Sequence, residues 1–297
     1  MEKLRRSMLF MPGNSPGMLQ DAAILGADSI ILDLEDAVSL TEKDSARILA
    51  REAIKTIDYS QVEVVVRVNP LDTEFGPHDV DVIARAKPDT LLIPKANEEG
   101  IRLVDKMLDQ IETEEGYLAG SIKLIALIET AQGLETVYNV IQASKRIVGV
   151  LLGGEDLTLD LGIERTRDGE ELFYARNKVA IACRALKVDC IDTPFTDASD
   201  CEGLTKDTAK AKSLGLTGKS AINPRQIGIL HSVFAPTAAE LKHALRVLEA
   251  MEEAEKEGKG VCSLDGKMID APIIKRATRT VNEGIRLGLI RDEGGAR

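Results

Sequence analysis

Eight short runs of β-branched and other apolar residues recur along the chain, and this recurrence constrains the fold more than any other feature. Each run ends in Gly, Pro, Asp or Asn and is followed by a stretch with apolar residues at helical spacing. One strand, loop and helix occupies about 30 residues, so the pattern predicts eight successive βα units. The runs begin near residues 7, 29, 62, 90, 123, 148, 189 and 216.

Eight near-even units favour a closed (β/α)₈ TIM barrel, which we expect over residues 1–235. Several runs (VVVRV, LIALI, VGVLL) are apolar almost throughout, as in strands buried on both faces of a parallel sheet. A doubly wound open sheet is the alternative, but no GxGxxG motif follows the first run. Residues 236–297 are predicted to form a C-terminal helical arm, which begins with a capping box at Thr237 and Glu240. Because a barrel closes without such an arm, we expect it to cover an active site, its own or that of a neighbouring subunit.

The composition excludes several classes of function. The chain has 38 basic and 49 acidic residues and a formal charge of −11, which argues against a nucleic-acid-binding protein. No run of 18 apolar residues is present, and the apolar run near the N-terminus is too short for a signal peptide, so we expect a cytoplasmic protein. The widely spaced cysteines are expected to be reduced thiols: Cys183, Cys190, Cys201 and Cys262.

Two acidic residues directly follow apolar strand runs and are the best candidates for metal ligands. Glu129 follows ALI, and Asp156 follows LLGGE. The carboxyl ends of barrel strands meet at one end of the barrel, where the chemistry of this fold lies. Several carboxylates brought together there need a positive partner, and Mg²⁺ or Mn²⁺ with oxygen ligands is the natural one. The alternative is that these acids only cap the helices that follow.

An arginine interrupts an otherwise apolar strand run. Arg67 lies in VVVRVN, where a guanidinium is costly unless it is paired. Its planar fork suits a substrate carboxylate. The alternative is an internal salt bridge to Asp33 or Glu35.

Lysines and glycines also end predicted strands. Lys95 is interpreted as charge balance or a phosphate contact rather than a Schiff-base lysine, because the nearby carboxylates favour its charged form. The segment GLTGKSAINP at 215–224 resembles a phosphate-binding turn, with Lys219 as its cation. The pair Gly153 and Gly154 is expected to let the backbone approach the metal site and the substrate.

Eight motifs, in this order, resemble one enzyme family over essentially the whole chain: RSMLFMPGN, LDLEDAV, VVVRVN, LIPK, ALIETAQGL, LLGGEDLT, TGKSAINP and GKMIDAP. They are similar to the citrate lyase β-subunits and the malyl-, citramalyl- and other acyl-CoA lyases of the HpcH/HpaI-type aldolase family. The resemblance implies a (β/α)₈ barrel, a Mg²⁺ site and no organic cofactor. It also implies retro-Claisen cleavage of a 3-hydroxy-3-carboxyacyl thioester.

The resemblance carries roles over to matching positions in the barrel. Glu129 and Asp156 match the metal ligands of the family, and Glu129 and Gly154 are also expected to contact substrate. Arg67 matches the arginine that binds the oxaloacetate-like carboxylates. Asp36, in LDLEDAV, matches an acid kept near the metal and is expected to take part in catalysis.

Two further groups of residues receive roles only from the resemblance. Arg6, Pro12 and Gly13 match an opening motif that contributes to binding the thioester or its phosphate. Asp270, in GKMIDAP, matches an acid that relatives present to the active site of a neighbouring subunit, where it would protonate the enolate.

The function predicted from the sequence is therefore that of a Mg²⁺-dependent carbon–carbon lyase. It would cleave a citryl thioester, carried on acyl carrier protein or CoA, to oxaloacetate and an acetyl thioester. The SAINP form of the motif around Asn223 and the short chain favour the carrier-protein substrate. A malyl-CoA or citramalyl-CoA lyase is the alternative, and a non-catalytic scaffold that binds a carrier protein is a more remote one. We expect a homo-oligomer, a trimer or hexamer, with citrate lyase α and γ subunits as candidate partners.

Overall fold

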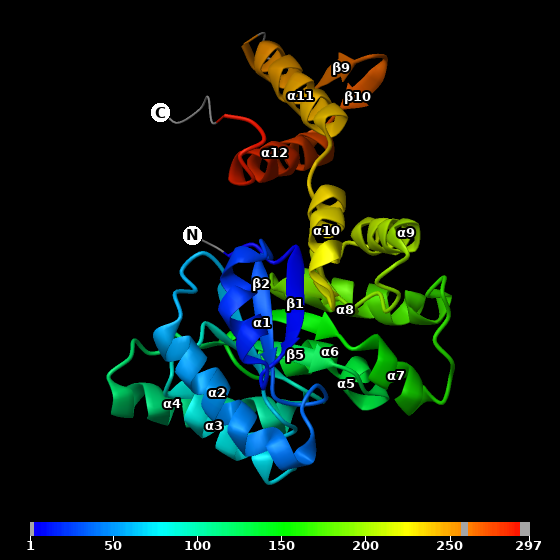
Figure 1. Cartoon of the computed structure of the whole chain (residues 1–297). Coiled ribbons are helices and arrows are strands. Elements are labelled where there is room, and N and C mark those ends of the chain that lie inside the picture. Colours follow the sequence, from blue (N-terminus) through cyan, green and yellow to red (C-terminus); the bar gives the residue numbers. More distant parts are fainter. Residues whose placement is uncertain (1–2, 257–260, 292–297) are drawn as a thin grey trace. The chain divides into compact units, whose positions relative to one another are not determined.

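The computed structural model describes residues 3–256 and 261–291, and the chain divides into two compact units, Met1–Phe234 and Ala235–Arg297. The first unit is a closed barrel of eight parallel strands in which each strand pairs with the next and β8 pairs with β1 (Figure 1). The predicted (β/α)₈ barrel is confirmed. Its strands are β1 (Ser7–Pro12), β2 (Ser29–Asp33), β3 (Glu63–Arg67), β4 (Thr90–Ile93), β5 (Lys123–Ile128), β6 (Ile147–Leu152), β7 (Asp189–Asp192) and β8 (Gly218–Ala221).

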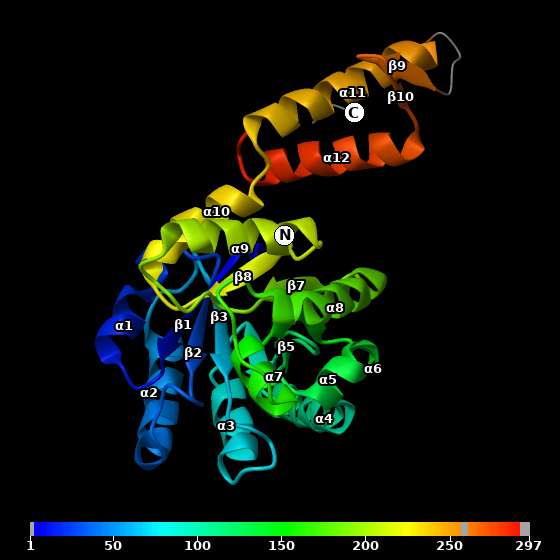
Figure 2. The same ribbon diagram turned by 90° about the vertical axis from the view of Figure 1, so that its right-hand side faces the viewer.

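Helices surround the barrel on the outside, as Figure 2 shows. The α-helices are α1 (Pro16–Asp21), α2 (Lys43–Thr56), α3 (Phe75–Ala84), α4 (Glu98–Glu115), α5 (Ala131–Glu135), α6 (Val137–Gln142), α7 (Gly154–Leu161), α8 (Phe173–Leu186), α9 (Cys201–Ser213) and α10 (Ile227–Phe234). Short 3₁₀ turns are η1 (Ala22–Ile24), η2 (Leu40–Glu42), η3 (Glu170–Leu172) and η4 (Pro224–Gln226).

Alternation along the strands separates two apolar cores. Side chains of successive strand residues point to opposite faces, so one set fills the barrel and the other packs beneath the helices. The set inside the barrel is Met8, Ile31, Val65, Leu92, Ile125, Leu127, Leu151 and Ile191. This alternation also decides which polar residues at the strand ends can reach the barrel interior.

The longest helix of the barrel unit shows how the sequence sets helix ends. The side chain of Asn97 accepts a hydrogen bond from the backbone N–H of Gly100 at 2.9 Å, which caps the N-terminus of α4. Gly116 ends the helix in the left-handed conformation, at φ 70°, which glycine adopts without strain.

The described part of the second unit contains two helices and a small hairpin: α11 (Ala238–Lys256), β9 (Cys262–Leu264), β10 (Lys267–Ile269) and α12 (Ala271–Arg286). The predicted capping box is present, because Thr237 N–H donates to Glu240 Oε2 and Glu240 N–H donates to Thr237 Oγ1. The hairpin is a feature that the predicted helical arm did not include. Its turn is formed by Asp265 and Gly266, both at positive φ, and the Asp-Gly pair is a known hairpin signal.

Two expectations drawn from composition can be compared with the structure. None of the described helices is both long and apolar enough to cross a membrane. Among the described cysteine side chains, Cys183, Cys190 and Cys201 are free thiols, and the side chain of Cys262 lies outside the described part.

Gly218 of β8 provides a test of how tightly the barrel closes. A Cβ at this position would lie 1.8 Å from the carbonyl oxygen of Arg5, so Gly218→Ala requires the backbone to move. We expect a loss at or beyond the upper end of the roughly 1–3 kcal/mol typical of overpacking, measured by urea unfolding. Gly228→Ala in α10 is the matched control, because nothing lies within 4 Å of its added Cβ, and it should not destabilise. Equal stability of the two variants would contradict this account.

Candidate active site at the carboxyl ends of the strands

The site is organised around an ion pair between neighbouring strands. Asp33 and Arg67 are register partners at the ends of β2 and β3, two residues beyond the inward-facing Ile31 and Val65. Arg67 Nε donates to Asp33 Oδ1 at 2.7 Å, and Nη2 donates to Asp33 Oδ2 at 2.6 Å. The internal salt bridge that the sequence left open as an alternative is therefore present, and Asp33 occupies one edge of the guanidinium.

The remaining nitrogen of Arg67 faces two more acids. Nη1 lies 3.1 Å from Glu35 Oε2 and 3.1 Å from Asp36 Oδ2, both in the turn after β2. Glu35 is buried, and its Oε2 accepts no hydrogen bond within the described structure. Asp36 is mostly exposed. The ring of Phe10 lies 5.1 Å from the guanidinium carbon, so the cation is held between an aromatic face and three carboxylates.

Glu129 reaches the same region from β5. It lies two residues beyond the inward-facing Leu127 and is 2% exposed. Its Oε1 accepts a 2.7 Å hydrogen bond from the backbone N–H of Lys95, which is held at φ 46°. A Cβ at Gly153 would lie 2.6 Å from Glu129 Cβ and 2.9 Å from Oε2. Gly153 is thus the glycine that makes room for this carboxylate.

Electrostatic coupling links these groups with Asp156, in the first turn of α7. Burial, with the nearby charge of Glu35, raises the pKa of Glu129 to about 8. Burial, with Asp36 and Asp33, raises the pKa of Glu35 to about 7 against the opposing effect of Arg67. Burial and Asp36 also raise the pKa of Asp156. We call these acids the mouth cluster: Asp33, Glu35, Asp36, Glu129 and Asp156.

The mouth cluster fits a divalent cation. Three of its acids, Glu35, Glu129 and Asp156, hold raised pKa values because they are buried and because the negative charge around them is only partly balanced by Arg67 and Lys95. The described residues contain no group of three or more His, Cys, Asp or Glu placed to hold a metal. A site with two carboxylates, Glu129 and Asp156, suits Mg²⁺, which keeps several coordination positions for water and substrate.

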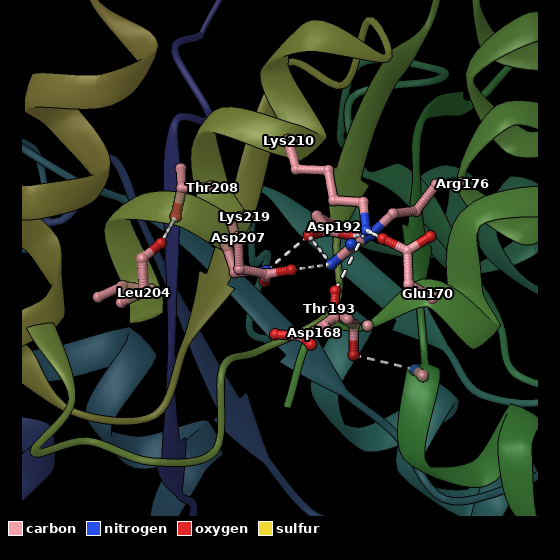
Figure 3. Close-up of polar contacts among 12 residues, drawn as sticks. Asp168, Glu170, Arg176, Asp192, Thr193, Leu204, Asp207, Thr208, Lys210 and Lys219 are labelled. Carbon is pink, nitrogen blue, oxygen red and sulfur yellow. Dashed lines mark hydrogen bonds and ion pairs between the residues drawn. The ribbon is translucent and has the colours of Figure 1, made fainter. Parts of the chain in front are cut away.

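Lys219 does not belong to this site, and its predicted role in substrate binding is wrong. It is fully buried, and its ammonium lies 2.5 Å from Asp192 Oδ2 and 2.6 Å from Asp207 Oδ2. Arg176 shares both carboxylates, as Figure 3 shows. The alternation of β8 turns Lys219 outward, toward α8 and α9, and the sequence did not reveal this because the strand has few apolar residues.

Arg6 is also misplaced by the resemblance. It directly precedes β1, at the end of the barrel opposite the mouth cluster. Its Nε and Nη2 donate to the two carboxylate oxygens of Asp28, at 2.9 and 2.8 Å. The structure therefore contradicts a role for Arg6 in binding thioester or phosphate at the mouth.

Pro12, Gly13 and Gly154, which were predicted to bind substrate, also follow strands of the barrel, and the two glycines form hydrogen bonds through their backbone N–H groups. Pro12 ends β1, and the N–H of Gly13 donates to the carbonyl of Asp33 at 2.8 Å. A Cβ at Gly13 would lie 2.8 Å from that carbonyl oxygen, so glycine permits the close approach. The N–H of Gly154 is bonded to Thr193 Oγ1 at 3.0 Å. Their substrate contacts remain predictions.

Asp270 caps α12 in the second unit. Its Oδ1 accepts a 3.2 Å hydrogen bond from the N–H of Ile273, and Pro272 lies in the first turn. This local role is compatible with the predicted action in a neighbouring subunit, which remains a prediction.

Comparison with known proteins identifies the family. The model of the HpcH/HpaI aldolase/citrate lyase family matches residues 6–224. The chain belongs to this family. Citrate lyase subunit beta from Haemophilus influenzae is 47% identical over 98% of this chain and 100% of that protein. A (3S)-malyl-CoA thioesterase from Cereibacter sphaeroides is 36% identical over 93% of each chain.

A solved structure adds ligands to the comparison. The citrate lyase beta subunit from Mycobacterium tuberculosis, complexed with oxaloacetate and magnesium, is 28% identical, with a TM-score of 0.66. The match covers 78% of this chain and 98% of that one. These findings confirm the predicted family and the predicted class, a carbon–carbon lyase, and they confirm that magnesium binds in a homologue.

The raised pKa of Glu129 predicts how the stability of the metal-free protein depends on pH. The folded state keeps this proton up to about pH 8, whereas an unfolded chain loses it near the ordinary pKa of 4.5. The unfolded state therefore binds fewer protons between these values, and the free energy of unfolding falls as pH rises through that window. Glu129→Gln should flatten the fall, measured by urea unfolding in chelator. Glu99→Gln, at an exposed position of α4, is the control and should leave the slope unchanged.

Proposed function

We propose that this chain cleaves a citryl thioester, carried on acyl carrier protein or on CoA, into oxaloacetate and an acetyl thioester. The observation that carries the proposal is the mouth cluster, in which Glu129 and Asp156 lie within electrostatic reach of Arg67. The citrate lyase subunits among its relatives support the citryl substrate over malyl and citramalyl thioesters.

Glu129 and Asp156 would hold the Mg²⁺ ion. Lys95 N–H fixes Oε1 of Glu129, which leaves Oε2, beside Gly153, as the oxygen for the metal. Bound there, Mg²⁺ would act as a Lewis acid that stabilises negative charge on the substrate oxygens. The missing Cβ of Gly153 keeps the space next to this oxygen open.

Arg67 would orient the oxaloacetyl part of the substrate. Because Asp33 occupies the edge formed by Nε and Nη2, a substrate carboxylate would meet the Nη1 side, where Glu35 and Asp36 now lie. Asp33 in turn fixes the guanidinium, so little side-chain entropy is lost when substrate binds.

The cleavage needs one proton acceptor and one proton donor. Removal of the hydroxyl proton allows the C–C bond to break, which gives oxaloacetate and the enolate of an acetyl thioester. Asp36 was the acid predicted near this step, and Glu35, with a pKa raised to about 7, is better matched to accept a proton near neutral pH. Asp270 of a neighbouring subunit would protonate the enolate carbon.

The partners follow from the substrate. A thioester on a carrier protein requires that protein to dock at the mouth, and the relatives named as citrate lyase subunits support α and γ subunits as further partners. We also propose a homo-oligomer, because the role of Asp270 requires a second copy of the chain.

The decisive experiment is a coupled assay with citryl-CoA and citryl carrier protein, in which malate dehydrogenase and NADH report oxaloacetate. We expect Mg²⁺-dependent oxaloacetate release that Glu129→Gln and Asp156→Asn lower at least about 100-fold, because each removes one of two metal ligands. Both variants should keep the circular dichroism and melting behaviour of a folded barrel.

The same assay separates the alternatives. Malyl-CoA and citramalyl-CoA are tested in parallel, and free thiol is measured because one relative is named a thioesterase. Free thiol without oxaloacetate would contradict the proposed lyase reaction. No turnover of any thioester, with Mg²⁺ bound, would favour the scaffold.

A mixing experiment tests the predicted action of Asp270 in trans. Asp270→Asn and Glu129→Gln should each be inactive alone, but a mixed oligomer would contain sites with both residues intact. Mixing them should therefore restore part of the activity. If subunits demonstrably exchange and no activity returns, Asp270 serves only as the N-cap of α12, where its loss would cost about 1 kcal/mol.

A further inference from the structure

Lys43 occupies a position that helix formation alone does not favour. It is the first residue of α2, where the positive end of the helix dipole repels a cation, and it is 6% exposed. Burial also lowers the pKa of its ammonium, against the attraction of Asp33 and Glu35. A buried lysine at a helix N-terminus therefore needs compensating contacts.

Those contacts are backbone carbonyls of the turn that carries three of the five acids of the mouth cluster, Asp33, Glu35 and Asp36. Lys43 Nζ donates to the carbonyl oxygen of Leu34 at 2.8 Å and to that of Glu35 at 2.5 Å. Asn69 Nδ2 donates to the same Leu34 oxygen at 2.9 Å. The outer side of the turn is thus tied by two donors from different elements.

The inner side of the turn is tied by Asp33. Its carboxylate accepts the N–H groups of Glu35 and Ala37, at 2.9 and 3.1 Å, besides its pair with Arg67. Asp33 therefore holds the N–H groups of the turn while Lys43 holds its carbonyls. Glu35 lies between these two anchors, and its side chain makes no hydrogen bond through Oε2.

We propose that Lys43 is a positioning residue that fixes the turn Asp33–Asp36, and with it the Glu35 carboxylate, against Arg67. The Glu35 side chain contacts Arg67 through the 3.1 Å ion pair between Oε2 and Nη1, and the position of its carboxylate relative to that nitrogen depends on the backbone that carries it. Lys43 acts through that backbone and does not touch substrate. The effect on activity rests on the proposed lyase function, whereas the effect on the turn does not.

The test compares Lys43→Met with Lys123→Met. Lys123, at the start of β5, also donates to a backbone carbonyl, that of Gly120 at 2.6 Å, but lies at the opposite end of the barrel. Methionine keeps an unbranched stem and removes the ammonium in both. Hydrogen exchange of residues 33–38 is measured by mass spectrometry, together with the melting temperature, kcat and KM for citryl-CoA.

We expect Lys43→Met to exchange faster over residues 33–38 and to lose at least about tenfold in kcat, with KM within about threefold of wild type. Lys123→Met should do neither. Lys43→Arg, which keeps a cation with several donors, should recover part of kcat. If the methionine variant does not fold, Lys43→Gln, which keeps an amide donor, takes its place. Its hydrogen exchange over residues 33–38, kcat and KM are then compared in the same way.

Two results would overturn the proposal. One is unchanged exchange over residues 33–38 in a folded Lys43 variant, whatever its activity. The other is a kcat within twofold of the Lys123→Met control. If the wild-type protein cleaves no citryl thioester, the proposed function fails and hydrogen exchange alone decides the role of Lys43.

Discussion

The ion pair between Asp33 and Arg67 is the interaction on which the active end of the barrel depends. It joins adjacent strands at their carboxyl ends, where alternation turns both side chains into the barrel. Removing one partner would leave a buried charge uncompensated, which typically costs about 3–5 kcal/mol. Asp33 also orders the turn after β2 through two backbone N–H groups, so the same carboxylate places Arg67, Glu35 and Asp36.

The other acids of the mouth cluster bring more negative charge to this end of the barrel than the nearby cations balance. Glu129 enters the barrel from the end of β5 because Gly153, which directly follows β6, has no side chain to exclude it. It lies within electrostatic reach of Glu35 and Asp156, and burial raises the pKa of all three acids. A cation bound there would attract these carboxylates and offset their mutual repulsion, so that they could ionise together. This is the physical reason for placing Mg²⁺ at this site.

Sequence periodicity predicted the barrel because every βα unit repeats the same local rule. Glu129 and Asp156 could be located because each follows a long apolar run whose end is unambiguous. The position of Lys219 could not be predicted, because β8 is short and polar. A shift of one residue along a strand moves a side chain from the barrel interior to the layer beneath the helices. Arg6 was carried over by resemblance, although a residue that precedes β1 lies at the opposite end. Glu35 was considered only as a salt-bridge partner of Arg67 and received no catalytic role, because only the structure shows that its carboxylate is buried among other acids.

Two clusters of charged residues in the barrel unit differ in how their charges are balanced. Around Lys219, two cations and two carboxylates contact one another: Arg176, Lys219, Asp192 and Asp207. This network is balanced in charge and needs no ligand, so it joins β7 and β8 to α8 and α9. In the mouth cluster the acids outnumber the cations, and Glu35 and Glu129 hold raised pKa values. What distinguishes a structural network from a reactive site is whether the fold brings compensating charges together, and that depends on side-chain direction at single strand positions.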